Sequence, residues 1–201
     1  MPESEAPRPP LRTERILAAL DRHGVEYVLI GGLAAVAHGS AIPTTDLDLV
    51  PEASRPNLAR LAAALRELDA KLRVPDLAYP LDVALDDHSF DAFTTAAFRT
   101  PHGDVDVVLR PDAPGRRRYF TYAELNERAQ NREAFGVTIR VADLGDIMAS
   151  KAAAGRPQDL AALPHLSALR TAVAEVEVSP EAAQDIESPP PAGPGRLDLG
   201  P

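Results

Sequence analysis

The chain has 201 residues, a length that suits one domain with a sizeable hydrophobic core. It contains no cysteine, which excludes disulfides and thiolate metal sites, and residues 1–10 contain no apolar signal segment. No apolar run reaches the roughly 20 residues that a membrane helix requires, so we expect a cytoplasmic protein with no membrane partner. The net charge of -9 argues against a nucleic-acid partner. Residues 171–201, however, carry six acids against one arginine, so the net charge of the whole chain does not decide whether residues 1–170 bind nucleic acid.

Apolar periodicity and turn residues predict alternating helices and strands in the first half of the chain. The apolar run that ends at Ile30 predicts a short buried strand, and a glycine pair follows it directly. In chain order we expect a helix over 11–23, a strand over 26–30, a helix over 33–38, a strand that begins at Asp46, a helix over 56–71, and a loop with one short strand over 73–91.

The second half predicts a hairpin, a helix, a strand and two further helices. In chain order these are a hairpin of 93–100 and 104–109 with its turn at 101–103, a helix over 122–133, a strand over 136–141, and helices over 144–154 and 157–173. This order indicates an α/β (α+β) fold, with a small mixed sheet flanked by helices. We expect residues 11–142 to form the core, residues 143–177 to form C-terminal helices packed on it, and residues 1–10 and the Pro-rich residues 178–201 to be disordered.

Two carboxylates one residue apart begin the strand at Asp46. In an extended strand, residues i and i+2 point to the same face, so Asp46 and Asp48 lie on one side. Carboxylate oxygens suit Mg²⁺ or Mn²⁺, and Mg²⁺ sites are usually completed by substrate phosphates and water. Gly31 and Gly32 allow the backbone to approach a phosphate. Alone, either motif is commonly a plain turn or a solvated strand end, but together they indicate a site for a nucleotide triphosphate with metal.

A second pair of acids supports this interpretation. Asp104 and Asp106 lie on one face of the second hairpin strand, and two neighbouring strands can present three acids to a two-metal centre. We expect Asp106 to be the third ligand and to take a proton from the acceptor hydroxyl, because a carboxylate beside cations stays ionised. Asp104 takes this place if the register differs by one pleat.

These residues resemble a known superfamily. The spacing from Ile30-Gly31-Gly32 to Asp46-Leu47-Asp48, with Asp106 downstream, is similar to that of DNA polymerase beta-like nucleotidyltransferases. Residues 143–160 resemble the "DL…K…AgR…D" signature of the AbiEii and MenT-type nucleotidyltransferase toxins of bacterial toxin-antitoxin pairs. The resemblance covers roughly residues 12–172. It implies transfer of a nucleoside monophosphate from a nucleotide triphosphate to an acceptor, commonly tRNA, and a cognate antitoxin as partner.

The resemblance also implies roles for individual residues. Lys151 would hold the triphosphate as a point charge, and Asp159 would pair with Arg156 or Lys151, although an acid that interacts with a helix dipole is the alternative for Asp159. A hydroxyl of Thr44 or Thr45 would contact a phosphate. In the MenT-like branch the residue at the place of Thr44 is phosphorylated to switch the toxin off, and a phosphate there would block both metal and nucleotide.

The chain departs from the pattern at one position. Many relatives carry arginine two residues before the Thr of the first motif, and here that residue is Ile42, which puts triphosphate binding in question. Two alternatives therefore stay open: a transferase of the same fold that acts on a small molecule or a protein, and a non-catalytic binding or antitoxin protein. Residues 116–118 are three arginines that either grip an RNA backbone or form an exposed basic loop.

Overall fold

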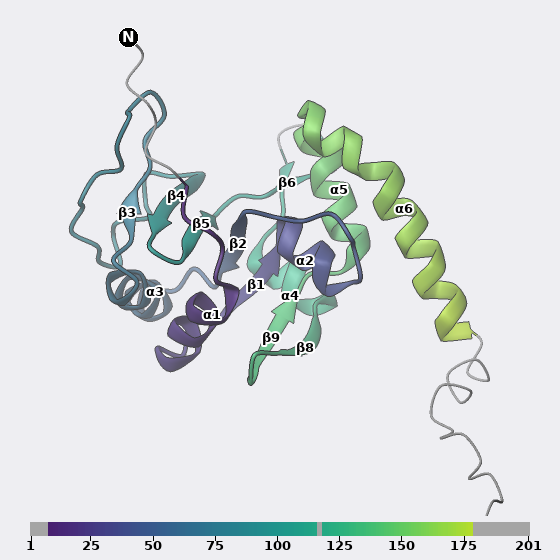
Figure 1. Ribbon diagram of the computed structural model, residues 1–201, viewed down its shortest axis with the longest axis horizontal. Coiled ribbons are helices and arrows are strands. Elements are labelled where there is room, and N and C mark those ends of the chain that lie inside the picture. Colours follow the sequence, from purple (N-terminus) through teal and green to yellow (C-terminus); the bar gives the residue numbers. More distant parts are fainter. Residues whose placement is uncertain (1–7, 116–117, 179–201) are drawn as a thin grey trace, which may run out of the picture.

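The computed structural model describes residues 8–115 and 118–178 (Figure 1). Its helices are α1 (Thr13–Arg22), α2 (Gly31–Ala37), α3 (Arg55–Glu67), α4 (Tyr122–Arg128), α5 (Leu144–Ala154) and α6 (Pro157–Val178). The main sheet contains β1 (Tyr27–Ile30), β2 (Asp46–Pro51), β3 (Lys71–Leu72), β4 (Thr95–Thr100), β5 (Gly103–Val108), β8 (Gln130–Ala134) and β9 (Val137–Val141). A separate short pair consists of β6 (Asp112–Ala113) and β7 (Arg118–Tyr119).

The main sheet is mixed, as expected for an α/β fold. Its strand order is β3-β4-β5-β2-β1-β9-β8, with β2 parallel to β5, β1 parallel to β9, and the other neighbours antiparallel. Parallel neighbours need a long crossover connection, and here α3, β3 and β4 lie between β2 and β5 in the chain. This crossover makes the two acid-bearing strands neighbours at the centre of the sheet.

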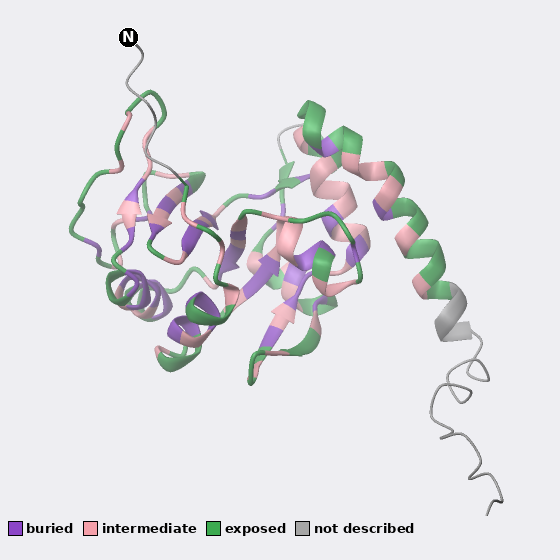
Figure 2. Ribbon diagram, viewed as in Figure 1, coloured by how far each residue is buried: buried purple, intermediate pink, exposed green. Residues whose placement is uncertain are grey.

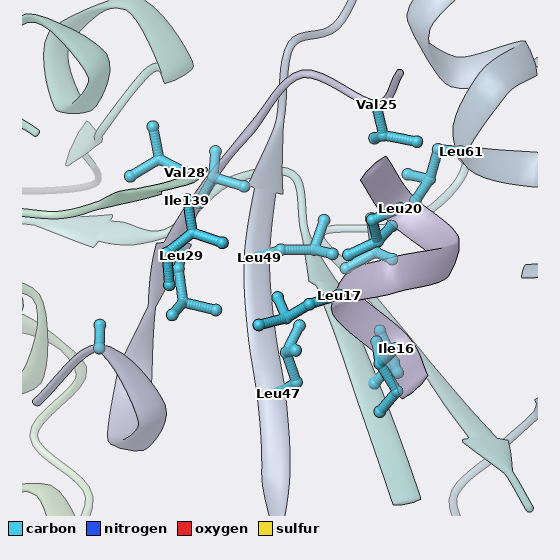
Figure 3. Packing of buried hydrophobic residues seen from close by; sticks show 14 of the residues in the cluster. Ile16, Leu17, Leu20, Val25, Val28, Leu29, Leu47, Leu49, Leu61 and Ile139 are labelled. Atoms are coloured by element: carbon cyan, nitrogen blue, oxygen red, sulfur yellow. The ribbon is translucent and has the colours of Figure 1, made fainter. Parts of the chain in front are cut away.

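One face of the central strands is buried under α1 and α3. Leu47 and Leu49 of β2 are fully buried and lie against Leu17 of α1 (Figure 3). Complete burial of a leucine side chain stabilises the fold by about 2 kcal/mol. Because side chains alternate along a strand, this packing leaves Asp46 and Asp48 on the opposite face. The hydrophobic core therefore determines the side of the sheet on which the acids lie. Figure 2 shows buried residues (purple) in α1, α3 and the central strands, where this core lies.

Most expected elements are confirmed, including the hairpin of β4 and β5 and the helix pair α5 and α6. The expected helix over 122–133 is wrong in its second half, because Ala129 adopts extended backbone angles and Gln130–Ala134 pairs with β9. The expected helix over 56–71 ends at Glu67, since Asp69 has a left-handed backbone (φ 50°) and Lys71 begins β3.

Several boundaries also differ from the expected ones. Helix α2 begins at Gly31, two residues earlier than expected, and α6 extends to Val178. The expectations of disorder for residues 1–7 and 179–201 lie outside the described residues, and residues 8–10 contain neither helix nor strand. Between residues 8 and 178, apart from 116 and 117, no helix is long and apolar enough to cross a membrane.

Candidate active site

The parallel pairing of β2 and β5 brings the expected acids together. In its register Asp46 lies opposite Asp104 and Asp48 lies opposite Asp106. Side chains at paired positions of neighbouring strands share a face, so all four carboxylates lie on the side of the sheet away from α1. The site that the sequence predicts from two separate motifs is thus one contiguous cluster. We call Asp46, Asp48 and Asp106 the three acids.

The electrostatics of the three acids show that their charges interact. The pKa of Asp48 is raised to about 7, first by burial and then by the charges of Asp46 and Asp106, against the opposing effects of Lys151 and Arg156. Burial likewise raises the pKa of Asp106 to about 6, against the opposing effect of Arg73. A bound cation would favour the ionised forms of Asp48 and Asp106, which burial disfavours.

The structure distinguishes the two candidates for the third acid. Asp104 is fully buried and forms ion pairs with three arginines: its carboxylate lies 3.1 Å from Arg73 Nη1, 3.1 Å from Arg99 Nε and 3.3 Å from Arg8 Nε. The Asp106 side chain is 23% exposed and lines a cavity that contains the other two acids. Asp106 is therefore the member of the pair that faces the cavity, and Asp104 lies in an ion-pair cluster behind it.

The glycine pair forms the wall opposite Asp48 and Thr44. Gly31 has a left-handed backbone (φ 68°), and a Cβ added to it would lie 1.9 Å from Asp48 Oδ2. A Cβ on Gly32 would lie 2.6 Å from Thr44 Oγ1, and the Thr44 hydroxyl donates a hydrogen bond of 2.8 Å to Asp46 Oδ1. Only glycine allows the backbone at the start of α2 to approach the carboxylate so closely.

Thr44 and Thr45 have different surroundings. Thr44 lines the cavity of the three acids, whereas the Thr45 hydroxyl accepts a hydrogen bond from Arg8 Nη1 (3.3 Å) and does not line that cavity. Of the two expected phosphate-contacting hydroxyls, the structure places Thr44 beside the acids.

Cations reach the same cavity from α5 and from the turn between α5 and α6. Lys151 Nζ lies 3.0 Å from Asp159 Oδ1, and Arg156 Nε pairs with Asp159 Oδ2. The Asp159 side chain is only 3% exposed, and burial raises its pKa. The hydrogen bonds and positive charges of Arg156 and Lys151 together outweigh burial and bring the pKa below the ordinary value. Asp159 thus holds two cations toward Asp48.

Arg156 is a member of the site for which the sequence predicts no role of its own. It follows Gly155, whose left-handed backbone (φ 65°) ends α5, and this turn directs Arg156 into the cavity. The available signal was its place in the "AgR…D" string, where it appeared only as a partner of Asp159.

These residues surround a cavity of about 570 Å³, within the size range of small-molecule sites. We call it the central cavity. It is lined on one side by the sheet and α2, and on the other by α5 and α6. Its lining residues include Gly31, Gly32, Thr44, Asp46, Asp48, Asp106, Lys151, Arg156 and Asp159.

The donor chemistry of the three acids fits a hard divalent cation. Within residues 8–115 and 118–178, no group of three or more acidic, histidine or cysteine side chains is arranged to hold a metal ion by itself. Mg²⁺, however, is commonly held by one or two carboxylates and completed by substrate phosphates and water. The carboxylates of Asp46, Asp48 and Asp106 therefore suit a metal that is bound together with a triphosphate.

Arg116 and Arg117, two of the three consecutive arginines that the sequence offers as an RNA contact, lie outside the described residues. Arg118 pairs with Glu124, the acid that also closes the capping box of α4. The one arginine of this run that the structure describes therefore supports the start of a helix.

A family model described as nucleotidyl transferase AbiEii toxin, Type IV TA system, matches residues 15–161. No curated protein matches the chain. The similar solved structures include the following two, both of low identity. ANT(2")-Ia in complex with adenylyl-2"-tobramycin is 19% identical (TM-score 0.48; 87% of this chain and 95% of that chain covered). An antigenic nucleotidyltransferase-like protein from Paracoccidioides brasiliensis is 16% identical (TM-score 0.41; 87% and 93% covered). Because the family model covers well over half of the sequence, the chain belongs to the AbiEii nucleotidyl transferase toxin family and is a nucleotidyltransferase.

Proposed function

We propose that the protein transfers a nucleoside monophosphate from a nucleotide triphosphate to the 3′ end of tRNA, and that it thereby halts translation as the toxin of a toxin-antitoxin pair. The observation that carries the proposal is the central cavity, in which three acids face Lys151 and Arg156. Acids can hold a metal with the triphosphate, and the two cations neutralise the phosphates.

The nucleotide is assigned to the wall formed by α2, α5 and α6. Its phosphates lie against Gly31 and Gly32, with the Thr44 hydroxyl and Lys151 Nζ as contacts, since close backbone approach and positive charge both favour phosphate. Ile42 also lines this cavity, so an apolar side chain replaces the expected arginine there. Lys151 and Arg156 still supply two positive charges.

Asp46, Asp48 and Asp106 are the residues that would hold Mg²⁺ or Mn²⁺. When bound, such a metal polarises the phosphoryl oxygens and neutralises charge that develops on them. Asp106 is the acid placed to accept the proton of the acceptor hydroxyl. The hydroxyl oxygen then bonds to the α-phosphorus, and the bond from that phosphorus to the β-phosphate oxygen breaks, so that pyrophosphate leaves with the electron pair.

The core and the C-terminal helices supply different residues of the central cavity. Residues 11–142 supply the three acids and the glycine wall. Residues 143–177 supply Lys151 from α5, Asp159 from α6, and Arg156 from the turn between these helices. Both parts are needed to complete the central cavity, so we assign them to one catalytic unit.

The tRNA acceptor can be tested by chemical blocking of its 3′ end. We expect the protein to transfer label from an α-labelled nucleotide triphosphate to intact tRNA. Periodate-oxidised tRNA should receive no label, because oxidation removes the terminal ribose hydroxyls. Equal labelling of both tRNAs would contradict transfer to the 3′ end, and label on the protein or on small molecules alone would favour the alternative acceptors.

We further propose that phosphorylation of Thr44, by the antitoxin or another kinase, inhibits the enzyme. The Thr44 hydroxyl lies 2.8 Å from Asp46 Oδ1 and next to Gly32, so a phosphate there would add about two negative charges beside the three acids and fill the space for the nucleotide. We expect phosphorylated protein to lose about 100-fold or more in transfer, and Thr44→Ala to escape inhibition. A Thr44→Ala protein that still acquires phosphate at the same stoichiometry would refute this switch.

A further inference from the structure

A second cavity, of about 370 Å³, lies between α5 and the hairpin of β6 and β7. We call it the hairpin cavity. One wall consists of residues 112–115 and 118–119, and the other consists of Ala149, Ala152 and Ala153 of α5. Figure 1 shows β6 beside α5. None of the roles described above uses this cavity.

The hairpin cavity adjoins the central cavity. Asp112 and Tyr119 line both cavities. These two residues lie opposite each other in the antiparallel register of β6 and β7. The pair is therefore the boundary between the two cavities. A ligand that extends from the three acids toward the hairpin meets Tyr119 and Asp112.

Tyr119 presents an aromatic ring at this boundary. The residue is 42% exposed, whereas its neighbour Phe120 is only 6% exposed and belongs to the hydrophobic core. The unpaired bases of single-stranded RNA stack on aromatic side chains, and this stacking tolerates any base sequence. Because Tyr119 lines two cavities and is not buried in the core, its ring is available as a stacking surface.

Arg110 lies between β5 and β6 and supplies a positive charge. It follows the end of β5 by two residues and lines the central cavity together with Asp106 and Val108. The residue is exposed, and within the part of the chain that the structure describes its side chain forms no hydrogen bond or ion pair. A guanidinium group can hold a phosphate through two parallel hydrogen bonds. Arg110 is therefore a cation at the central cavity that the proposed triphosphate site does not use.

Asp112 favours a nucleotide over a lone anion at this boundary. Its exposed carboxylate lines both cavities and would repel a free phosphate. A carboxylate accepts hydrogen bonds from the amino group of a base or from the 2′-hydroxyl of ribose. A ribonucleotide carries these donors, a flat base and a phosphate in one molecule, so it matches Asp112, Tyr119 and Arg110 together.

The position of these residues fits the acceptor. In phosphoryl and nucleotidyl transfer the attacking and leaving oxygens lie roughly in line, so the acceptor and the pyrophosphate lie on opposite sides of the transferred phosphorus. In the sheet, β2 lies between β1, which leads into the glycine pair of α2, and β5, which carries Asp106. The triphosphate is assigned to the glycine pair on the β1 side. Arg110, which follows β5, therefore lies on the acceptor side.

We propose that the hairpin cavity binds the single-stranded 3′ end of a polyribonucleotide acceptor, with the terminal base stacked on Tyr119 and the phosphate of that nucleotide held by Arg110. The terminal ribose hydroxyl then lies at Asp106. This inference rests on the proposed transfer to RNA and adds to it the residues that bind the acceptor. A protein acceptor, or an RNA end whose terminal base is paired, offers no free base to Tyr119.

Two pairs of variants test the site by different routes. Tyr119→Ala removes the stacking surface, and Tyr119→Phe keeps it. Arg110→Gln removes the positive charge, and Arg110→Lys keeps the charge without the fork. Tyr79→Ala and Arg15→Gln are the matched controls, because both residues are exposed and line neither cavity.

We expect Tyr119→Ala and Arg110→Gln to raise the KM for tRNA about 10-fold, with the KM for the nucleotide changed less than about 2-fold. Tyr119→Phe should keep the KM for tRNA within about 3-fold of the unaltered protein. Arg110→Gln should also reduce the salt dependence of tRNA binding by about one phosphate contact, with partial recovery in Arg110→Lys. Both controls should behave like the unaltered protein. An unchanged KM for tRNA in Tyr119→Ala, with or without a raised KM for the nucleotide, would overturn the proposal while transfer to tRNA still stands.

Direct binding separates this proposal from the proposed function. The Kd of a short single-stranded oligoribonucleotide is measured without nucleotide for the unaltered protein, Tyr119→Ala and Tyr79→Ala, and is measured again with an oligoribonucleotide that lacks its 3′-terminal base. Loss of the base should raise the Kd of the unaltered protein and of Tyr79→Ala about 10-fold, and should leave that of Tyr119→Ala unchanged, because each change removes one partner of the same contact.

The outcomes of this experiment are independent of labelling. If no tRNA is labelled but the Kd values follow this pattern, the hairpin cavity binds RNA and the proposed tRNA transfer fails. Equal binding of the intact oligoribonucleotide by all three proteins would refute the hairpin-cavity site, whatever the result for labelling.

Discussion

Replacement of Asp48 by asparagine is expected to lower nucleotidyl transfer at least about 1,000-fold and, at the same time, to make the metal-free protein more stable above neutral pH. Activity falls because Asp48 is one of the three acids assigned to the metal. Stability rises because the substitution removes a carboxylate that is partly buried beside Asp46 and Asp106, where its ionisation is unfavourable.

The pH dependence of this effect has a definite sign. The pKa of Asp48 is about 7 in the folded protein, against an ordinary value of 3.8. Between about pH 4 and pH 7 the folded state therefore binds more protons at this residue than the unfolded state, so this carboxylate makes the protein less stable as pH rises through that window. Asp48→Asn lacks this loss, and its advantage should grow from near zero at pH 4 to at most about 4 kcal/mol at pH 8.

Chemical unfolding of both proteins in a chelator at pH 4.5 and pH 8, with no added metal, measures the difference. Asp21→Asn, at an exposed position of α1, is the control and should not alter the pH dependence. Added Mg²⁺ with nucleotide should raise the stability of the unaltered protein and have little effect on Asp48→Asn. Equal or lower stability of Asp48→Asn at pH 8 would show that the carboxylate is not under electrostatic strain.

Replacement of Gly31 by alanine is expected to lower transfer at least about 100-fold and to destabilise the fold by about 3 kcal/mol or more. The added Cβ would lie 1.9 Å from Asp48 Oδ2, far inside van der Waals contact, so Asp48 or the start of α2 must move. Either movement separates the glycine wall from the acids. A second cost arises because alanine at φ 68° adopts a left-handed backbone.

Gly136→Ala separates these two costs. Gly136 also has a left-handed backbone (φ 79°), but a Cβ there would meet nothing within 4 Å. We expect it to lose about 1 kcal/mol from backbone strain and to keep full activity. Thermal unfolding and transfer rates of the two variants give the comparison. If Gly31→Ala lost no more stability and no more activity than Gly136→Ala, the close approach of Gly31 to Asp48 would have no functional importance.

The sequence predicts the centre of the site because local patterns specify it. The glycine pair after an apolar strand, and the alternation of acids and apolar residues at Asp46 and Asp106, follow from spacing alone. The expectation of Asp106 rather than Asp104 does not follow from spacing, because both lie on one face; it is what the resemblance to the superfamily implies. In the structure, two arginines outside β5 form ion pairs with Asp104. They are Arg99 of β4 and Arg73, which directly follows β3.

The missed elements are those whose structure depends on distant partners. Strand β8 has the sequence Gln-Asn-Arg-Glu-Ala, with no alternation of apolar and polar residues, and it is extended because it pairs with β9. Strand β3 has two residues and pairs with β4. Arg73 likewise forms an ion pair with Asp104, more than 20 positions away, which no local pattern indicates.

We propose that the central cavity catalyses nucleotidyl transfer. The position of the transferred phosphate in the nucleotide tests this proposal most directly. The purified protein is incubated with Mg²⁺, total tRNA and nucleotide triphosphates labelled at either the α- or the γ-phosphate, in parallel with Asp48→Asn. We predict that the α-label moves to the acceptor and that the γ-label is released in pyrophosphate, with both events lost in Asp48→Asn. Transfer of the γ-label to an acceptor, or equal α-label transfer by Asp48→Asn, would contradict the account.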